Sequence, residues 1–384
     1  MSTIYDTAIL GAGASGLMAS SILQGRNILI DANPKAGVRV SISGGGRCNF
    51  TNLKLGADNY RGDATFISEV LSGFDNRDSR KWFASRGLKS VVRGDGQLFC
   101  AGRAEELLSI LQRESRNVSR LFSADIESVT LQRGLFTTKT SAGVVVSRRV
   151  LLALGGASYP KIGGGMRGLE IARAMGHDIV PAAPALTGFT LQPPQFFMKE
   201  LSGISIPVVL TVAERVYSGD MLFAHRGISG PVIFNASLRW ERGEISLNMI
   251  PGFDLKSMRG SGKRLSTLLP LPTRLSKALL SHLKIEDIPA KRMDAKSLAR
   301  LSVLREYRFA PAGTFGYSRA EVMRGGVDTD MVDPSTMMSR VVKGLYFAGE
   351  VLDVTGELGG YNLQWAFSSA VRAAESINRE IGVG

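Results

Sequence analysis

The chain has 384 residues, 44% of them hydrophobic, and a formal net charge of +13. This length gives room for about two or three domains. No apolar stretch approaches the roughly 18 residues of a membrane span, and the N-terminus lacks the basic segment of a signal peptide. We therefore expect a cytoplasmic protein. Two cysteines, Cys48 and Cys100, and three histidines offer no basis for a disulfide framework or a metal centre.

The first segment of the chain has the pattern of a βαβ unit. An apolar strand, a glycine motif, a helical run and a second strand follow one another at residues 7–10, 11–16, 17–24 and 27–30. In such a motif Gly11 permits a tight turn, Gly13 lets backbone N–H groups approach a pyrophosphate, and Gly16 lets the helix pack on the strand. Asp31 ends the second strand, where a carboxylate accepts hydrogen bonds from ribose hydroxyls. The segment predicts an adenine-dinucleotide site.

A run of three glycines at residues 44–46 follows. Successive glycines cost backbone entropy on folding and contribute no side chain, so we expect this backbone to lie against a ligand. Arg47 supplies a cation for a pyrophosphate, and Asn49 and Asn52 supply amide groups. Cys48 is either a buried apolar residue or a thiol that faces a redox centre.

The next part of the chain alternates between helical and strand patterns. We expect helices at 66–86 and 103–112 and strands at 97–100, 121–128, 134–139 and 144–153. The last of these strands ends in the close turn Gly155-Gly156, which returns the chain to the nucleotide domain. A second match to the glycine motif, at 163–168, is separated from that strand by residues 158–160, so we do not count it as an independent nucleotide site.

A proline-rich segment at 181–194, with four prolines, predicts a linker out of the first domain. Beyond it, short strand patterns at 206–213, 221–223 and 244–250 predict a small β-barrel or sandwich. The turn at 224–231 is the polar feature of this module. Its His225 either donates a proton to a substrate or is a structural histidine with satisfied hydrogen bonds.

Basic residues are concentrated between Leu255 and Arg308. This segment has thirteen Lys and Arg against four Asp and Glu, so it holds +9 of the net +13. Helical patterns at 275–283 and 296–305 account for much of it, and the basic residues include Lys291, Arg292, Lys296 and Arg300. The segment is either a solvated helical surface or a binding surface for a polyanion such as nucleic acid.

The C-terminal segment contains a second glycine-rich site. A strand ends at Gly349-Glu350, and Gly359-Gly360 precede a helix at 363–377. The carboxylate would lie beside a sugar hydroxyl, and the helix N-terminus would place N–H groups and a positive dipole end on an anionic ring edge, such as N1 and the C2 carbonyl of a reduced flavin. Two ligand-facing glycine sites at opposite ends of the chain favour FAD over NAD as the resident cofactor.

With these motifs, the chain resembles the flavoproteins described as BaiN/RdsA-like or aminoacetone-oxidase-like. The resemblance runs through the motifs at 11–16, 43–52, 96–100, 153–160, 222–231, 325–329 and 344–369. It implies an α/β fold in which a Rossmann-like FAD-binding domain of the two-dinucleotide-binding type is interrupted by a β-barrel and a small helical insert. The corresponding boundaries are 1–186 and 313–384 for the FAD-binding domain, 187–254 for the barrel and 255–312 for the basic helices.

The resemblance also implies which residues hold FAD. These are Gly11, Gly13, Ala14, Ser15, Gly16, Asp31, Gly45, Gly46, Arg47, Cys48, Asn49, Gly155, Gly349, Glu350, Gly360, Tyr361, Asn362 and Leu363, with the backbone of Ile126 at the adenine.

The residues of several motifs are most similar to those of the RdsA branch of the family, whose members are ribosomal RNA dihydrouridine synthases. That resemblance implies that NAD(P)H reduces FAD, which then reduces a splayed-out uridine of large-subunit ribosomal RNA, and that a side chain protonates C5. Cys48, Cys100 and His225 are the candidate acids, and Lys291, Arg292, Lys296 and Arg300 are the candidate RNA-binding residues. One alternative is an oxidase or reductase of a small molecule, such as an amine or a steroid-like enone, for which the basic surface is incidental. Another is a flavin-dependent RNA-binding protein without turnover.

Overall fold

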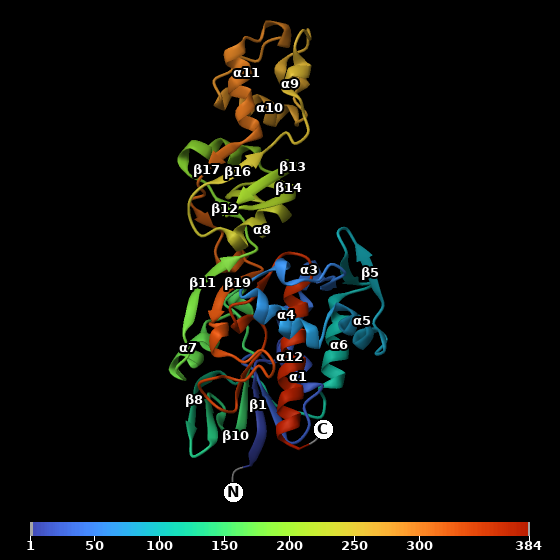
Figure 1. Cartoon of the computed structure of the whole chain (residues 1–384), viewed down its shortest axis with the longest axis vertical. Coiled ribbons are helices and arrows are strands. Elements are labelled where there is room, and N and C mark those ends of the chain that lie inside the picture. The colour runs from blue at the N-terminus through green and yellow to red at the C-terminus, as the bar shows by residue number, and fades with distance from the viewer. Residues whose placement is uncertain (1–2, 383–384) are drawn as a thin grey trace. The chain divides into compact units, whose positions relative to one another are not determined.

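The computed structural model describes residues 3–382, which divide into two compact units (Figure 1). Unit 1 comprises residues 1–183 and 322–384, and unit 2 comprises residues 184–321. Unit 1 is therefore built from both ends of the chain, and unit 2 is inserted between them. The four-segment division expected from the sequence stays a prediction.

Unit 1 begins with the predicted βαβ unit. Strand β1 (Ile4–Leu10), helix α1 (Ala14–Ser20) and strand β2 (Asn27–Ile30) follow one another, and β1 pairs in parallel with β2. The inner residues of β1 are buried because the strand lies inside the sheet, as parallel strands of α/β folds do. The helix begins at the glycine motif and is shorter than the predicted run, since the chain turns at Ser21.

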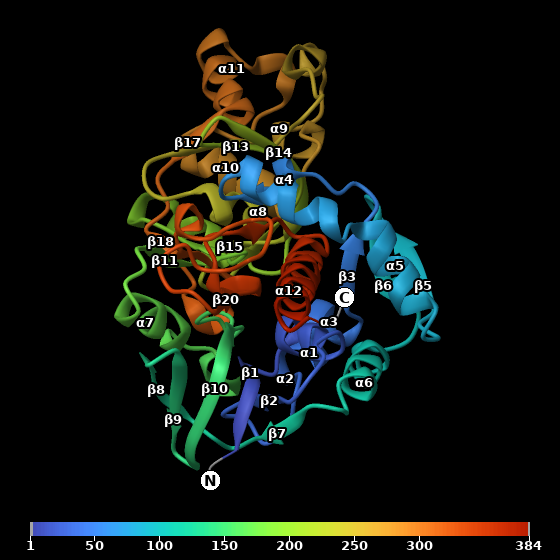
Figure 2. The same ribbon diagram turned by 60° about the horizontal axis from the view of Figure 1, so that its bottom comes forward.

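The central sheet of unit 1 has seven strands, in the order β7-β2-β1-β10-β9-β8, with β20 also paired to β10. The further strands are β7 (Ser119–Leu121), β8 (Ile126–Gln132), β9 (Leu135–Thr140), β10 (Gly143–Leu152) and β20 (Leu345–Phe347). The long C-terminal helix α12 (Tyr361–Glu380) packs beside α1 (Figures 1 and 2). The sheet thus joins the two ends of the chain in one core, and the Rossmann-like α/β fold is confirmed.

Smaller elements complete unit 1. Three sheets of two or three strands are formed by β3 (Asn49–Asn52), β6 (Gln97–Cys100) and β5 (Ser90–Arg93), by β4 (Tyr60–Arg61) and β21 (Thr355–Gly356), and by β11 (Ile179–Ala185) and β19 (Val322–Val327). The remaining helices are α2 (Val38–Ser41), α3 (Ser43–Gly46), α4 (Ala64–Gly73), α5 (Asn76–Ala84), α6 (Ala104–Glu114) and α7 (Arg167–Ala174).

Unit 2 contains a second seven-stranded sheet, with the order β17-β16-β13-β14-β15-β12-β18. Its strands are β12 (Phe189–Thr190), β13 (Ser205–Val212), β14 (Arg215–Ala224), β15 (Gly227–Ser229), β16 (Ile245–Asn248), β17 (Tyr307–Phe309) and β18 (Gly313–Thr314). The helices are α8 (Pro231–Arg239), α9 (Leu265–Leu268), α10 (Thr273–His282) and α11 (Ala295–Ser302). Buried side chains of the sheet and the helices form one cluster, so both share a core.

Two expectations from the sequence need correction. The segment 181–194 is not a plain linker, because β11 and β12 form within it and a 3₁₀ helix starts at Pro193. The predicted helix at 296–305 ends as α-helix at Ser302 and continues as a 3₁₀ turn to Arg305. Among residues 3–382, none of the helices is both long enough and apolar enough to cross a membrane.

Candidate functional site

The glycine motif lies at the carboxyl ends of β1 and β10, where its three glycines have different surroundings. Gly11 has a φ of +106°, and a Cβ there would lie 2.3 Å from the carbonyl oxygen of Ala153. A Cβ on Gly16 would lie 1.8 Å from the carbonyl oxygen of Gly11. A Cβ on Gly13, in contrast, would meet no described atom within 4 Å. Two glycines are therefore required by packing, whereas Gly13 leaves an open cradle next to the N–H groups of Ala14 and Ser15, which begin α1.

Asp31 lies beside this cradle, as the sequence predicted. Its Oδ2 accepts a hydrogen bond of 2.6 Å from the N–H of Ala12, and its Oδ1 accepts one of 2.7 Å from the N–H of Asn33. These bonds fix the carboxylate at the end of β2 while leaving lone pairs on both oxygens. The hydroxyls of a ribose bound at the cradle could donate hydrogen bonds to this carboxylate.

The second glycine site is packed directly against the first. A Cβ on Gly349 would lie 2.7 Å from Oγ of Ser15, and the N–H of Gly349 donates to Oγ of Ser369 at 2.9 Å. Nε1 of Trp365, on α12, donates to the carbonyl oxygen of Gly349 at 3.1 Å. The structure thus brings the predicted residues from the two ends of the chain into one site.

Glu350 connects three segments around this site. Its carboxylate accepts hydrogen bonds from the guanidinium of Arg39 at 2.9 Å and from the N–H groups of Gly156 at 3.1 Å and Met323 at 2.7 Å. A Cβ on the neighbouring Gly155 would lie 3.0 Å from Nη1 of Arg39. Arg39 was not expected from the sequence, because α2 carries no motif that marks a cation. Arg47, which was expected to meet the pyrophosphate, is exposed, and its role stays a prediction.

The glycine-rich loop and β3 lie next to the N-terminus of α12. Gly44, Gly45 and Gly46 all have positive φ, and a Cβ on Gly45 or Gly46 would meet no described atom within 4 Å. A Cβ on Gly360, which caps α12, would lie 2.6 Å from Oδ1 of Asn49. The loop therefore exposes bare backbone near the helix end, consistent with a planar ligand lying there.

The remaining predicted cofactor residues lie in three environments. The side-chain amide of Asn362 accepts a hydrogen bond from the N–H of Gly356 and donates one to its carbonyl oxygen, both at 2.8 Å. Burial raises the pKa of the neighbouring Tyr361 to about 12. Leu363 follows them in the first turn of α12 and is half-buried. Ile126 is buried at the start of β8. Asn362 and Tyr361 thus shape the loop before the helix, and Ile126 belongs to another edge of the central sheet.

The two cysteines meet in the small sheet of unit 1. Both side chains are buried, and the N–H of Cys100 donates to the carbonyl oxygen of Cys48 at 3.1 Å. The hydrogen bond that the Cys48 thiol donates to the sulfur of Cys100, together with burial, raises the pKa of Cys48 well above its ordinary value, so this thiol holds its proton at neutral pH. His225 is an exposed residue of unit 2, in the turn between β14 and β15.

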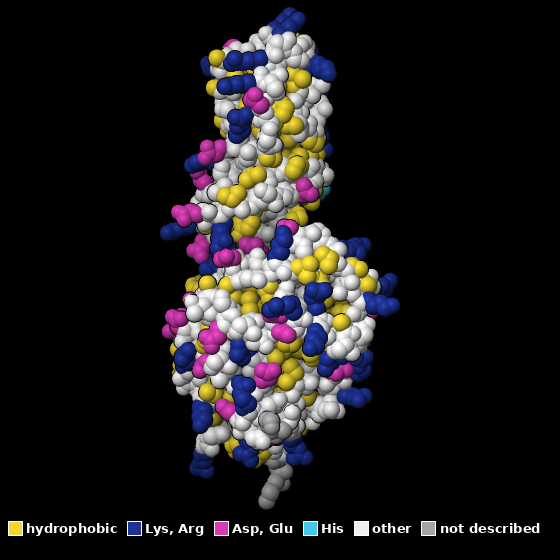
Figure 3. Space-filling model, turned by 45° about the vertical axis from the view of Figure 1, so that its right-hand side comes forward, with side chains coloured by type: hydrophobic (Ala, Val, Ile, Leu, Met, Phe, Trp, Pro, Cys, Tyr) yellow, Lys and Arg dark blue, Asp and Glu magenta, His cyan; other side chains and the backbone are white. Residues whose placement is uncertain are grey.

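The predicted RNA-binding residues lie at the surface of unit 2. Lys291 and Arg292 belong to a 3₁₀ turn, and Lys296 and Arg300 are four residues apart on α11, so they share one helix face. All four side chains are exposed, and Nη1 of Arg300 donates to the carbonyl oxygen of Lys284 at 2.9 Å. Lys and Arg side chains (dark blue) are visible over the helices of this unit in Figure 3.

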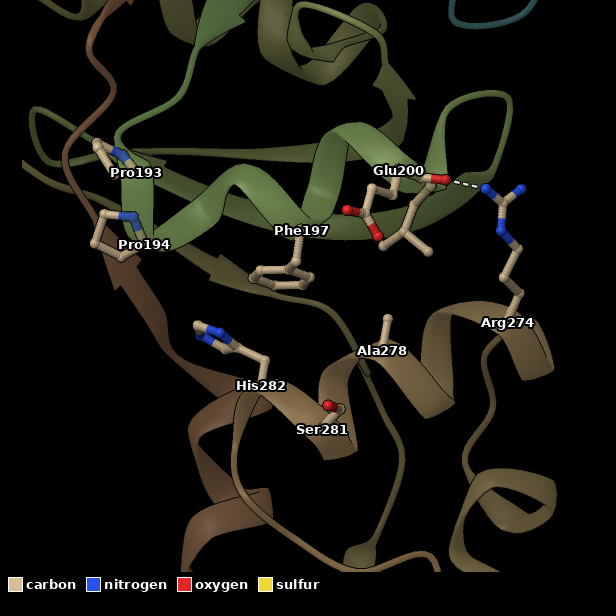
Figure 4. A pocket seen from close by; sticks show the side chains of 9 residues that line it. Pro193, Pro194, Phe197, Glu200, Arg274, Ala278, Ser281 and His282 are labelled. Carbon is tan, nitrogen blue, oxygen red and sulfur yellow. Dashed lines mark hydrogen bonds between the residues drawn. The ribbon is translucent and has the colours of Figure 1, made fainter.

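Unit 2 also has a pocket of about 490 Å³ between α10 and the 3₁₀ helix at 193–201 (Figure 4). The ring of His282 stacks on Phe197 with centroids 4.3 Å apart, and its Nε2 is hydrogen-bonded to the hydroxyl of Tyr307 at 2.9 Å. Burial lowers the pKa of His282. This histidine packs as an aromatic residue, and the pocket wall also carries the charged residues Glu200 and Arg274.

The fold and the site together define a Rossmann-type dinucleotide-binding protein. The open cradle at Gly13, the oriented Asp31 and the bare loop at 44–46 fit FAD, which needs a pyrophosphate contact, a ribose acceptor and a flat ring site. The fold is similar to that of a quinol fumarate reductase from E. coli, with a TM-score of 0.51 at 14% identity over 100% of this chain and 72% of that one.

A family model for the HI0933-like protein Rossmann domain matches residues 5–376, so the chain belongs to this family. It is 36% identical to a ribosomal RNA dihydrouridine synthase from Escherichia coli over 97% of this chain and 98% of that protein, and 34% identical to one from Haemophilus influenzae over 99% and 100%. It is 28% identical to a 3-dehydro-bile acid delta(4,6)-reductase from Clostridium scindens over 96% and 98%. The chain is an FAD-dependent oxidoreductase.

Proposed function

We propose that this protein uses NAD(P)H and FAD to reduce a uridine of large-subunit ribosomal RNA to dihydrouridine. The observation that carries the proposal is the similarity, over nearly the whole chain, to two proteins named ribosomal RNA dihydrouridine synthase. The basic surface and the site of unit 1 are consistent with it.

The site residues of unit 1 would hold FAD in an extended form. The N–H groups after Gly13 would bind the pyrophosphate, and Asp31 would accept hydrogen bonds from the ribose hydroxyls. The N-terminus of α12 at Gly360, with Asn49 against it, would face the flavin ring, because N–H groups and a positive dipole end favour negative charge there. Glu350 holds the guanidinium of Arg39 beside Gly156.

The relatives share one kind of chemistry. Uridine has a C5=C6 double bond conjugated to the C4 carbonyl, and the name of the bile acid reductase describes double bonds conjugated to a 3-oxo group. FAD, when bound and reduced by NAD(P)H, supplies two-electron reduction of such a bond. The chain must then supply a proton at C5, and Cys48, which keeps its proton at neutral pH, is one candidate beside Cys100 and His225.

An RNA substrate also accounts for the charge of the chain. Lys291, Arg292, Lys296 and Arg300 are exposed cations that could neutralise phosphates, which is the main source of affinity for nucleic acid. A small neutral substrate would not need them. The charge is therefore a second line of support, independent of the comparisons.

The proposal is tested with purified protein, bound FAD and large-subunit ribosomal RNA from cells that lack the gene. NADH and NADPH are supplied in separate reactions, and mass spectrometry of the digested RNA is used to look for a uridine that has gained two hydrogens. Conversion that requires FAD and either nucleotide would support the proposal. RNA that stays unmodified while reduced FAD is reoxidised by a small enone would favour the alternative, a small-molecule reductase, for which the bile acid reductase is the precedent.

A further inference from the structure

The sheet formed by β3, β6 and β5 has one face that is buried along β3 and β6 but exposed at the edge strand β5, where Val92 is 55% exposed, and one open face. Phe50, Leu98 and Cys100 are buried, and the ring of Phe83, on α5, packs against that of Phe50 with centroids 5.6 Å apart. Figures 1 and 2 both show α5 beside this sheet. The opposite face carries side chains that are half-buried or exposed, namely Asn49, Lys89, Val91, Arg93, Gln97 and Phe99.

The open face begins at the candidate flavin site. Asn49, which lies against Gly360, is the cross-strand partner of Phe99, and Phe99 is in turn the partner of Val91. The side-chain amides of Asn49 and Gln97 share a hydrogen bond of 2.9 Å, which confirms that these residues point to the same side. Since neighbouring strands are about 4.8 Å apart, the backbone of Val91 lies about 10 Å from that of Asn49.

Cations and an aromatic ring lie along this row. Lys89 and Arg93 are two residues before and after Val91, so their side chains project from the same face. Both are exposed, and neither forms an ion pair with any residue between 3 and 382. The guanidinium of Arg93 lies 5.4 Å from the ring centroid of Phe99. The sequence between residues 77 and 93 has six Lys and Arg and a single acid.

We propose that this open face binds the single-stranded RNA that flanks the target uridine. Exposed aromatic rings beside unpaired cations are the composition of surfaces that stack bases and hold phosphates without reading a sequence. Phe99 with Arg93 would stack a neighbouring base, and Lys89 and Arg93 would neutralise phosphates on either side. The inference rests on the proposed function and adds an RNA contact in unit 1, distinct from the basic helices of unit 2.

A simpler explanation accounts for part of these observations. Charged side chains on an exposed edge strand such as β5 prevent it from pairing with other proteins, and Lys89 and Arg93 would serve that purpose. The exposure of β5 does not distinguish the two explanations, because Val92 on the other face is 55% exposed and Val91 on the open face is 36% exposed. Edge protection leaves unexplained the half-buried ring of Phe99, which lies on the central strand β6 beside the guanidinium of Arg93. A binding face accounts for the cations and for this ring together.

The test compares two variants that lose the same charge. Lys89→Gln/Arg93→Gln removes the cations of the open face, and Arg80→Gln/Lys81→Gln removes two exposed, unpaired cations from α5, which covers the opposite face. The probe is a labelled oligouridine of about 12 nucleotides, within the usual site size, and its binding is followed by fluorescence anisotropy across a salt series.

We expect Lys89→Gln/Arg93→Gln to lose at least about tenfold in affinity and to lower the slope of log affinity against log salt by roughly 1 to 1.5. The control should stay within about twofold of wild type, because its cations lie away from the open face. Phe99→Leu should lower affinity by roughly fivefold or more with an unchanged salt slope, since it removes stacking and no charge. All variants must keep the FAD spectrum and melting temperature of wild type.

Three outcomes would overturn the inference. Equal losses in the two charge variants would indicate a general effect of net charge, and wild-type affinity of Lys89→Gln/Arg93→Gln would show that RNA binds elsewhere. Weaker binding to anionic phosphatidylglycerol vesicles, with RNA binding unchanged, would assign the face to a membrane surface. Dihydrouridine formation by wild type is measured separately, so RNA binding at this face without product would refute only the proposed function.

Discussion

The carboxylate of Glu350 and the guanidinium of Arg39, 311 residues apart in sequence, form an ion pair of 2.9 Å at the candidate FAD site. The same carboxylate accepts the N–H groups of Gly156 and Met323. It therefore joins helix α2, the loop at Gly156 and strand β19 near the end of β10.

Replacing Glu350 by alanine should destabilise unit 1 and lower its FAD content together. The change leaves a half-buried guanidinium and two N–H groups without their acceptor, which should cost about 2–4 kcal/mol. The melting temperature should fall by roughly 5–10 °C. Calorimetry and the ratio of flavin to protein absorbance measure the two effects. The control is Glu380→Ala, which breaks the 2.9 Å pair with Arg149 at the far end of α12 and should leave FAD content unchanged.

The glycines of the motif should respond differently to alanine. Gly16→Ala should not yield folded protein, because its Cβ would lie 1.8 Å from a carbonyl oxygen. Gly13→Ala should fold with wild-type stability, since Gly13 has an extended conformation that alanine adopts and its Cβ would meet no described atom within 4 Å. Its FAD affinity should nevertheless fall by at least about tenfold if the pyrophosphate approaches there. Full FAD occupancy of Gly13→Ala would place the cofactor elsewhere.

Unit 1 should lose stability when the solution is acidified. Burial lowers the pKa of His177, whose ring is held by the carbonyl of Ala172 at 3.1 Å and the hydroxyl of Ser339 at 2.7 Å. Below about pH 6.5 the unfolded histidine binds a proton that the folded one resists, so stability falls with pH in that range. His177→Gln, which does not titrate, should flatten the dependence of melting temperature on pH. An unchanged profile would show that other groups cause it.

The basic helices of unit 2 should contribute to RNA affinity without affecting FAD. Lys291→Glu/Lys296→Glu should weaken binding of large-subunit ribosomal RNA at least about tenfold and reduce its salt dependence, while the flavin spectrum stays as in wild type. Arg215→Glu/Arg242→Glu, an equal charge change at exposed positions outside the basic segment, is the control. If both variants bind RNA with the affinity of wild type, the basic segment is a solvated surface and not an RNA-binding one.

Much of unit 1 was predictable because its signals are local. The three apolar residues 28–30, together with the preceding Asn27, define β2 to the residue, and the glycine motif fixes where α1 begins. The C-terminal helix was predicted from its periodicity, although it starts two residues earlier, at Tyr361, and ends three later, at Glu380. FAD as the cofactor followed from motifs of this kind.

What the sequence did not show depends on contacts between distant segments. The Arg39–Glu350 pair and the row from Asn49 through Phe99 to Val91 arise only when strands pair, and none of these residues stands in a recognisable motif with its partner. Prolines in the segment 181–194 suggested a linker. Among residues 3–382, however, β11 pairs only with β19, and a strand with a free edge tolerates a residue that lacks an N–H.

The most direct test of the proposed activity is the dihydrouridine content of large-subunit ribosomal RNA, measured by mass spectrometry in cells with and without this gene. We predict that one dihydrouridine disappears on deletion, returns with the intact gene, and does not return with a Gly13→Asp variant, whose carboxylate would occupy the cradle for the pyrophosphate. An unchanged dihydrouridine content after deletion would contradict the account and assign the protein to a small-molecule substrate.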